Sequence, residues 1–139
     1  MRYLLDTSIW LWSVGSVDKI NKQGRDLLAD GKQEFYLSAA SSWEISIKAA
    51  SGKLQLPGSP ASYVPKRLAE QGIIPLPILH QHSLAVYDLP KHHSDPFDRL
   101  LIAQAQIEEM VVLTADSVFR SYQVAIVWCG SAMGRLVQG

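Results

Sequence analysis

Short apolar runs alternate with longer segments of mixed polarity along the whole chain. Runs of this length that are rich in β-branched and aromatic residues are typical of strands, and apolar residues three or four positions apart are typical of helices. Five runs predict strands, at 2–5, 35–38, 73–78, 111–114 and 124–128. Six segments predict helices, at 7–12, 18–30, 39–50, 61–71, 80–88 and 95–105.

Strands that alternate with helices favour a parallel sheet with helices packed on both of its faces. We therefore expect an α/β protein with three layers, α/β/α, around a short central parallel sheet of about five strands. Pro75 and Pro77 suggest that the third strand is short or lies at an edge. The chain of 139 residues has the length of one domain, 1–139, and its tail from about residue 130 is weakly patterned.

The clearest helix start is at Asp95, where an N-cap residue precedes Pro96 at the first helical position. Small and apolar residues follow up to Ala105, so the beginning of this helix is expected to pack on the core. Asp116 is expected to begin another, shorter helix after the fourth strand.

Charge and cysteine content exclude several classes of protein. Thirteen basic and thirteen acidic residues cancel, which argues against a polybasic nucleic-acid binder but leaves room for a local basic groove. Cys129 is the single cysteine, so no intramolecular disulfide forms and a cytoplasmic location is expected. Asp6 interrupts the first apolar run too early for a signal peptide, and the uncharged stretch 72–87 contains prolines, so no membrane association is expected.

Four of the acidic residues occupy positions that lead to the same edge of the predicted sheet. Asp6 directly follows the first strand, and Asp116 lies two residues after the fourth. Glu44 lies early in the helix that follows the second strand, and Asp98 lies in the first turn of the helix that Asp95 opens. In open parallel sheets, functional sites lie outside the carboxyl ends of the strands. We therefore expect these four side chains to converge.

Each acid also has an ordinary structural role open to it. Asp6 and Asp116 would cap helices, Asp98 would complement a helix dipole, and Glu44 would pair with Lys48 four residues later. Four carboxylates at one place repel one another unless a cation neutralises them, and oxygen ligands favour Mg²⁺ or Mn²⁺. Such ions activate water and polarise phosphoryl oxygens, so phosphodiester hydrolysis is the expected reaction class.

The sequence resembles a PIN domain and, more narrowly, the VapC-type ribonuclease toxins of prokaryotic toxin–antitoxin pairs. The resemblance runs from about residue 2 to residue 128, and the stretch 95–105 is its most specific part. Four segments carry it: 4–8 (Leu-Leu-Asp-Thr-Ser), 42–45 (Ser-Trp-Glu-Ile), 92–105 (His-His-Ser-Asp-Pro-Phe-Asp-Arg-Leu-Leu-Ile-Ala-Gln-Ala) and 113–116 (Leu-Thr-Ala-Asp).

The resemblance implies a metal-dependent endoribonuclease that uses Mg²⁺ or Mn²⁺, acts on RNA, forms a homodimer and is inhibited by a small cognate antitoxin. The family's acidic quartet falls on Asp6, Glu44, Asp98 and Asp116, which would hold the metal and act in catalysis. An antitoxin peptide would cover this acidic groove and present an arginine to the carboxylates.

Other residues of these segments are left with two interpretations each. Thr7, Ser8 and Thr114 match polar positions that support the acids or a bound water, and capping explains them equally well. Arg99 would contact RNA phosphate or pair with a neighbouring acid, or else lie on the surface.

Further side chains of these segments stay outside the predicted metal set. Asp95 is explained as an N-cap, and His92 and His93 would contact phosphate or line the loop. Trp10, Trp12 and Trp43 are expected to be core or interface aromatics.

Two rival functions stay open. One is a metal-dependent phosphatase of small esters with Asp6 as nucleophile, although such enzymes typically have a second aspartate where this chain has Ser8. The other is a PIN-like module that binds a partner protein without cutting RNA. The complete acidic quartet argues against this second alternative.

Overall fold

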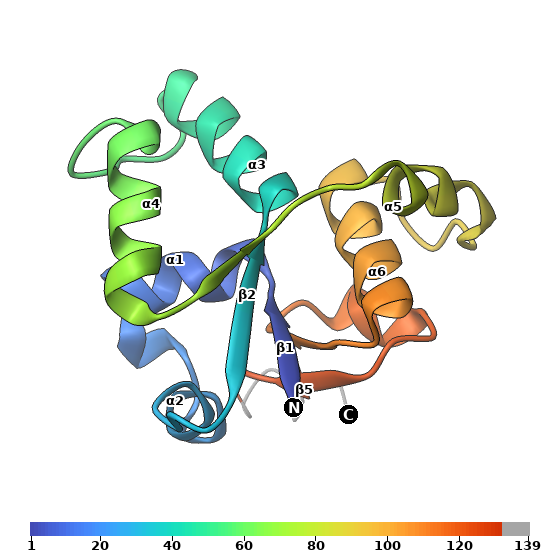
Figure 1. The fold of residues 1–139 in the computed structure, drawn as a ribbon, viewed down its shortest axis with the longest axis horizontal. Coiled ribbons are helices and arrows are strands. Elements are labelled where there is room, and N and C mark those ends of the chain that lie inside the picture. Colours follow the sequence, from blue (N-terminus) through green and yellow to red (C-terminus); the bar gives the residue numbers. More distant parts are fainter. Residues whose placement is uncertain (132–139) are drawn as a thin grey trace.

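The computed structural model describes residues 1–131 and contains a five-stranded sheet in which every neighbouring pair of strands is parallel (Figure 1). The strand order is β3-β2-β1-β4-β5. The predicted parallel sheet of about five strands is therefore confirmed. The strands are β1 (Arg2–Leu5), β2 (Glu34–Ser38), β3 (Ile74–Leu76), β4 (Val111–Thr114) and β5 (Ile126–Trp128).

Helices cover both faces of the sheet, which confirms the three-layer α/β/α architecture. Figure 1 shows α1, α2 and α4 on one side of the strands, α5 and α6 on the other, and α3 beyond the carboxyl end of β2. The α-helices are α1 (Thr7–Gly15), α2 (Lys22–Leu28), α3 (Ala39–Ala50), α4 (Pro60–Gln71), α5 (His80–Ala85) and α6 (Pro96–Glu108). The 3₁₀ turns are η1 (Val17–Lys19), η2 (Val86–Asp88) and η3 (Ser117–Ser121).

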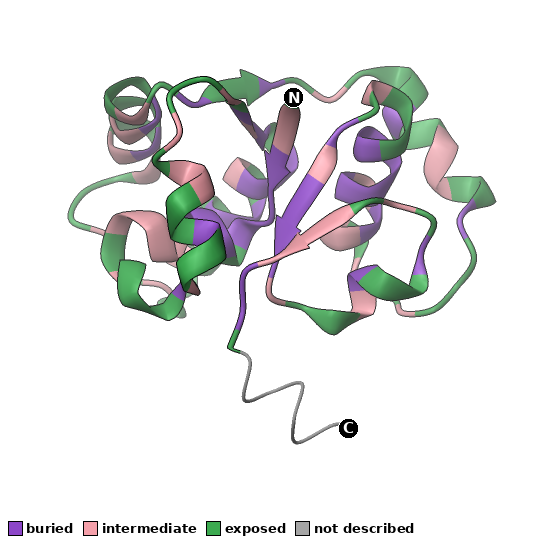
Figure 2. Cartoon of the chain, turned by 90° about the horizontal axis from the view of Figure 1, so that it is seen from below, coloured by how far each residue is buried: buried purple, intermediate pink, exposed green. Residues whose placement is uncertain are grey.

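Two hydrophobic cores lie on the opposite faces of the sheet. Successive side chains of a strand point to opposite faces, so Leu4 and Val112 join the core that contains Leu101 of α6, whereas Leu5 and Leu113 join the other. Buried residues follow the central strands and the inner sides of the helices, and exposed residues follow the outer turns (Figure 2). This double burial fixes the register of β1 and β4.

The helix predicted over 18–30 is wrong in its first part. The structure has η1 at Val17–Lys19, an extended backbone at Ile20 and Asn21, and then α2. Ile20 is fully buried, and the Asn21 amide donates to the carbonyl oxygens of Trp128 (3.0 Å) and Gly130 (2.9 Å). Because Asn21 also caps α2 by accepting from the Gly24 N–H, a continuous helix would lose these bonds.

Several predicted bounds shift slightly. β3 and β5 are shorter than the predicted runs, and α4 continues through Pro65. The weakly patterned tail predicted from about residue 130 lies mostly outside the described residues, which end at 131. No helix in the described part of the chain is long and apolar enough to span a membrane.

Candidate active site

The pairing of β1 with β4 sets two of the predicted acids beside one threonine. Leu5 is in register with Leu113, and the Asp6 N–H donates to the Leu113 carbonyl (2.9 Å), so Asp6 lies next to Thr114. The Thr114 hydroxyl donates to Asp6 Oδ2 (2.8 Å) and accepts from the backbone N–H of Asp116 (3.0 Å). The fully buried Thr114 hydroxyl therefore links the Asp6 carboxylate to the backbone of Asp116 at the sheet edge.

The ordinary capping roles hold for one of these two acids and not for the other. Asp6 occupies the N-cap position of α1, but its side chain makes no capping hydrogen bond. Asp116 caps η3, because its Oδ1 accepts from the Val118 N–H (3.0 Å). The carboxylate of Asp6 thus has no helix-capping function and is nevertheless buried.

The first turn of α6 brings Asp98 to the same place. Asp95 is the N-cap, as predicted, and its Oδ1 accepts from the N–H groups of Phe97 (2.9 Å) and Asp98 (3.1 Å). Because Asp95 satisfies the helix start, the Asp98 side chain is not needed as a cap. Asp98 Oδ2 lies 3.4 Å from His93 Nε2.

Glu44 approaches from α3 and is buried, with its side chain bound to Lys48. The Lys48 Nζ lies 2.8 Å from Glu44 Oε2, so the predicted pair one helical turn apart is present. This bond raises the pKa of Lys48, and the negative charges of Asp95 and Asp98 raise it as well. Lys48 is therefore held as a cation beside the carboxylates.

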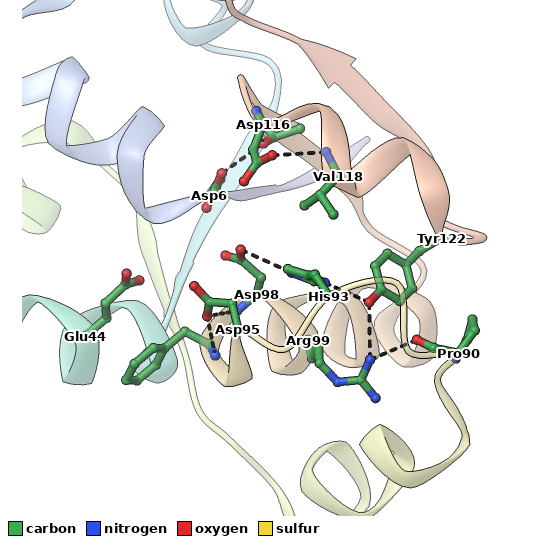
Figure 3. A network of polar contacts seen from close by, with 12 residues as sticks. Asp6, Glu44, Pro90, His93, Asp95, Asp98, Arg99, Asp116, Val118 and Tyr122 are labelled. Atoms are coloured by element: carbon green, nitrogen blue, oxygen red, sulfur yellow. Dashed lines mark hydrogen bonds and ion pairs between the residues drawn. The ribbon is translucent and has the colours of Figure 1, made fainter.

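Figure 3 shows the carboxyl groups of Asp6, Asp98 and Asp116 facing a shared space, with Glu44 directed toward it from α3. Within residues 1–131, however, no three His, Cys, Asp or Glu side chains lie close enough together to hold one ion by themselves. An ion there would take one or two carboxylates directly and keep several waters, which is how proteins usually bind Mg²⁺.

The electrostatics of this space disfavour negative charge. Burial, together with the charges of Asp6, Asp95, Asp116 and Glu44, raises the pKa of Asp98 to about 8. Burial also raises the pKa of Asp6 to about 6, although hydrogen bonds from Thr114 and the Thr7 backbone partly offset the effect. A divalent cation reverses this penalty because it stabilises the ionised carboxylates. The donor set therefore fits a hard cation.

The predicted supporting residues differ in where they lie. Thr7 is buried and its hydroxyl donates to Ser41 Oγ (2.8 Å), which ties the start of α1 to α3. Ser8 is exposed in the first turn of α1. Thr114 contacts the acids directly, as described above. Of these three side chains, only the Thr114 hydroxyl hydrogen-bonds to a member of the quartet.

Arg99 is neither on the surface nor paired with an acid. Its guanidinium is buried and donates to the carbonyl oxygens of Val86 (3.3 Å), Leu89 (3.3 Å) and Pro90 (2.8 Å). Among the ion pairs of residues 1–131, none joins Arg99 to a carboxylate. Arg99 points away from the acids in Figure 3 and holds the segment before α6 in place.

Tyr122 is a residue of this region that the sequence did not indicate. Its hydroxyl lies 3.2 Å from the Arg99 guanidinium and 2.8 Å from His93 Nδ1, and the other ring nitrogen of His93 faces Asp98. A chain of polar contacts therefore runs from Arg99 through Tyr122 and His93 to Asp98. No local pattern predicts it, because Tyr122 lies beyond β4 and meets His93 only in the folded chain.

Comparison with known proteins finds similarity over most of the described chain. The PIN domain family model matches residues 3–125. Ribonuclease VapC16 of Mycobacterium tuberculosis is 41% identical over 68 residues, which are 49% of this chain and 48% of that protein. The matched segment thus spans about half the length of this relative.

Solved structures share the fold at low sequence identity. VapBC2 from Rickettsia felis, bound to a DNA fragment from its promoter, aligns with a TM-score of 0.70 at 15% identity, covering 93% of this chain and 99% of that chain. FitAcB from Neisseria gonorrhoeae aligns with a TM-score of 0.58 at 22% identity, covering 89% and 95%. The family match covers β1, apart from Arg2, through β4 and includes all four acids, and the chain therefore belongs to the PIN domain family.

Proposed function

We propose that this protein is a metal-dependent endoribonuclease that hydrolyses RNA phosphodiester bonds and acts as the toxin of a toxin–antitoxin pair. The observation that carries the proposal is the convergence of Asp6, Asp98 and Asp116 at one sheet edge, with Glu44 facing them. The raised pKa values of Asp6 and Asp98 indicate that ionised carboxylates are unfavourable there unless a cation neutralises them. The relative named as a ribonuclease supports the choice of RNA.

In this proposal the acids have unequal roles. Asp6, Asp98 and Asp116 would hold Mg²⁺ or Mn²⁺, directly or through water, and the ion would supply activation of the attacking water and stabilisation of the phosphoryl oxygens. Thr114 keeps Asp6 and the backbone of Asp116 in place. Glu44, with one oxygen held by Lys48, would orient the attacking water with its other oxygen.

The test is cleavage of RNA by purified single variants Asp6→Asn, Glu44→Gln, Asp98→Asn and Asp116→Asn with Mg²⁺ or Mn²⁺. Each is expected to lose activity by orders of magnitude, whereas Asp18→Asn on the exposed turn η1 is expected to cut as the parent does. Full activity in all four variants would refute the assignment. Cleavage of small phosphate esters without cleavage of RNA would favour the phosphatase alternative instead, and a parent that fails to bind Mn²⁺ would favour the non-cutting module.

The partners follow from the same proposal. Structures of similar fold are VapBC and FitAB assemblies, several of them bound to DNA, which supports a small antitoxin and a homodimer here. A buried, unpaired Cys129 agrees with a cytoplasmic location. Expression alone is expected to arrest growth, and coexpression with the product of a small neighbouring gene is expected to relieve it. Harmless expression with no such gene nearby would contradict the toxin role.

A further inference from the structure

Trp43 is not a core residue, although most tryptophans are largely buried. Its side chain is 59% exposed, on the second turn of α3 and directly before Glu44 in the sequence. By contrast, Trp10 on α1 is fully buried and its indole N–H donates to Gln71 Oε1 (2.9 Å). An indole left in water beside a candidate active site needs an explanation other than packing.

A second aromatic ring holds Trp43 at this position. Its ring lies edge-to-face with that of Phe97, with centroids 5.1 Å apart and an interplanar angle of 76°. The backbone of Phe97 is fixed in turn, because its N–H donates to Asp95 Oδ1. Phe97 directly precedes Asp98, so the pair connects the two helices that carry Glu44 and Asp98. Trp43 is thus exposed and also held in a defined orientation.

The charges around Trp43 and Phe97 indicate which kind of ligand the two rings can bind. When a polynucleotide approaches the carboxylates, its phosphates are repelled by the acids. Its bases are uncharged, so they can stack on aromatic rings even beside carboxylates. Two lysines follow Trp43 in the sequence. Lys48 lies on α3 and is half exposed, and Lys53 lies just after α3, where its backbone N–H donates to the Lys48 carbonyl. Both lysines lie on or just after α3, the helix that carries Trp43, and would provide positive charge for phosphates.

We propose that Trp43, held by Phe97, stacks a base of single-stranded RNA next to the phosphate that is cut. This inference rests on the proposed ribonuclease function and adds to it a subsite for the substrate. The subsite is sequence-tolerant, because every base has a π-face, and it requires an unpaired base. RNA with an unpaired nucleotide at the cut is therefore expected to bind more tightly than a duplex of the same sequence.

The emission of Trp43 reports on the stacking directly. A short single-stranded RNA is titrated into the protein in Ca²⁺, and a gel verifies that the RNA stays intact. The parent and Trp12→Phe, a control on α1, are expected to show strong quenching, and Trp43→Phe is expected to lose most of it. Trp43→Ala is expected to bind this RNA roughly 5- to 150-fold more weakly. In RNA cleavage, Trp43→Ala is expected to raise KM more than it lowers kcat. Its affinity for Mn²⁺ is expected to be unchanged.

Three results would overturn the inference. One is RNA binding by the parent without a change in Trp43 emission, another is parental affinity in Trp43→Ala, and the third is no binding of RNA by the parent. Parental RNA affinity in Trp43→Ala combined with weaker binding of a protein partner would assign the aromatic pair to a protein interface. Quenching that persists in a protein unable to cut RNA would instead count against the ribonuclease proposal alone.

Discussion

Single residues at the sheet edge show how far the sequence predicts the candidate site. The positions of Asp6 and Asp116 after strands, and of Asp98 at a helix start, follow from local patterns. The bridging role of Thr114 does not, because it depends on β1 and β4 being neighbours with Leu5 opposite Leu113. The place of Arg99 next to Asp98 in the sequence predicts a role near the acids, yet its side chain turns toward the carbonyl oxygens of Val86, Leu89 and Pro90.

Replacing Thr114 by valine is expected to weaken the site without changing the shape of the buried side chain. The change removes the hydrogen bond to Asp6 and leaves the Asp116 N–H without its acceptor. Loss of such supporting bonds typically weakens metal binding or activity by about 10- to 100-fold. Mn²⁺ titration and RNA cleavage rates measure the effect. Thr114→Ser keeps the hydroxyl and is expected to restore most of both; a valine variant equal to the parent would show that Thr114 has no role.

At the scale of elements, the start of α6 depends on two separate anchors. Asp95 caps the helix, as the Asp-Pro pair predicts, and Arg99 ties the helix to the preceding segment through buried hydrogen bonds. Elsewhere, the polar pattern over 18–30 suggested one helix, but the amide of Asn21 binds the end of β5 and interrupts it. Local patterns therefore predict most element types, whereas contacts between distant segments decide where some of them break.

Arg99→Met is expected to lower the free energy of unfolding by about 2–4 kcal/mol, because four acceptors lose their donor in a buried setting. Urea unfolding followed by circular dichroism measures the change. Arg120→Met serves as the control, since Arg120 is exposed and stacks on Trp128, and its expected effect is below about 1 kcal/mol. Equal midpoints for the two variants would mean that the Arg99 anchor does not stabilise the fold.

At the scale of the whole molecule, a neutral chain concentrates carboxylates at one edge of its sheet. The alternation of strands and helices predicted the three layers, and burial on both faces of the sheet fixes its central strands. The strand order and the exposure of Trp43 were not predictable, because both depend on how distant helices pack. Because the acids are grouped, the stability of the folded state is expected to depend on pH, although the numbers of acidic and basic residues are equal.

Stability of the metal-free protein is expected to fall as the pH rises from about 5 to above 8. The folded pKa values of Asp6 and Asp98, about 6 and 8, lie above the ordinary value of 3.8, so the folded state binds more protons than the unfolded state in this window. One pKa unit corresponds to about 1.4 kcal/mol, so the loss is on the order of a few kcal/mol. Thermal unfolding in EDTA measures it, and Asp98→Asn is expected to flatten the curve. An identical slope in that variant would contradict this account.

The most direct test of the central claim, that these carboxylates form one site for a divalent cation, is calorimetric titration of Mn²⁺ at pH 7.5. The parent and Asp18→Asn are expected to bind with the same affinity. Asp6→Asn, Asp98→Asn and Asp116→Asn are each expected to bind at least about tenfold more weakly, because each loses a carboxylate charge that holds the ion directly or through water. Equal binding by all five proteins, or no binding by the parent, would contradict the claim.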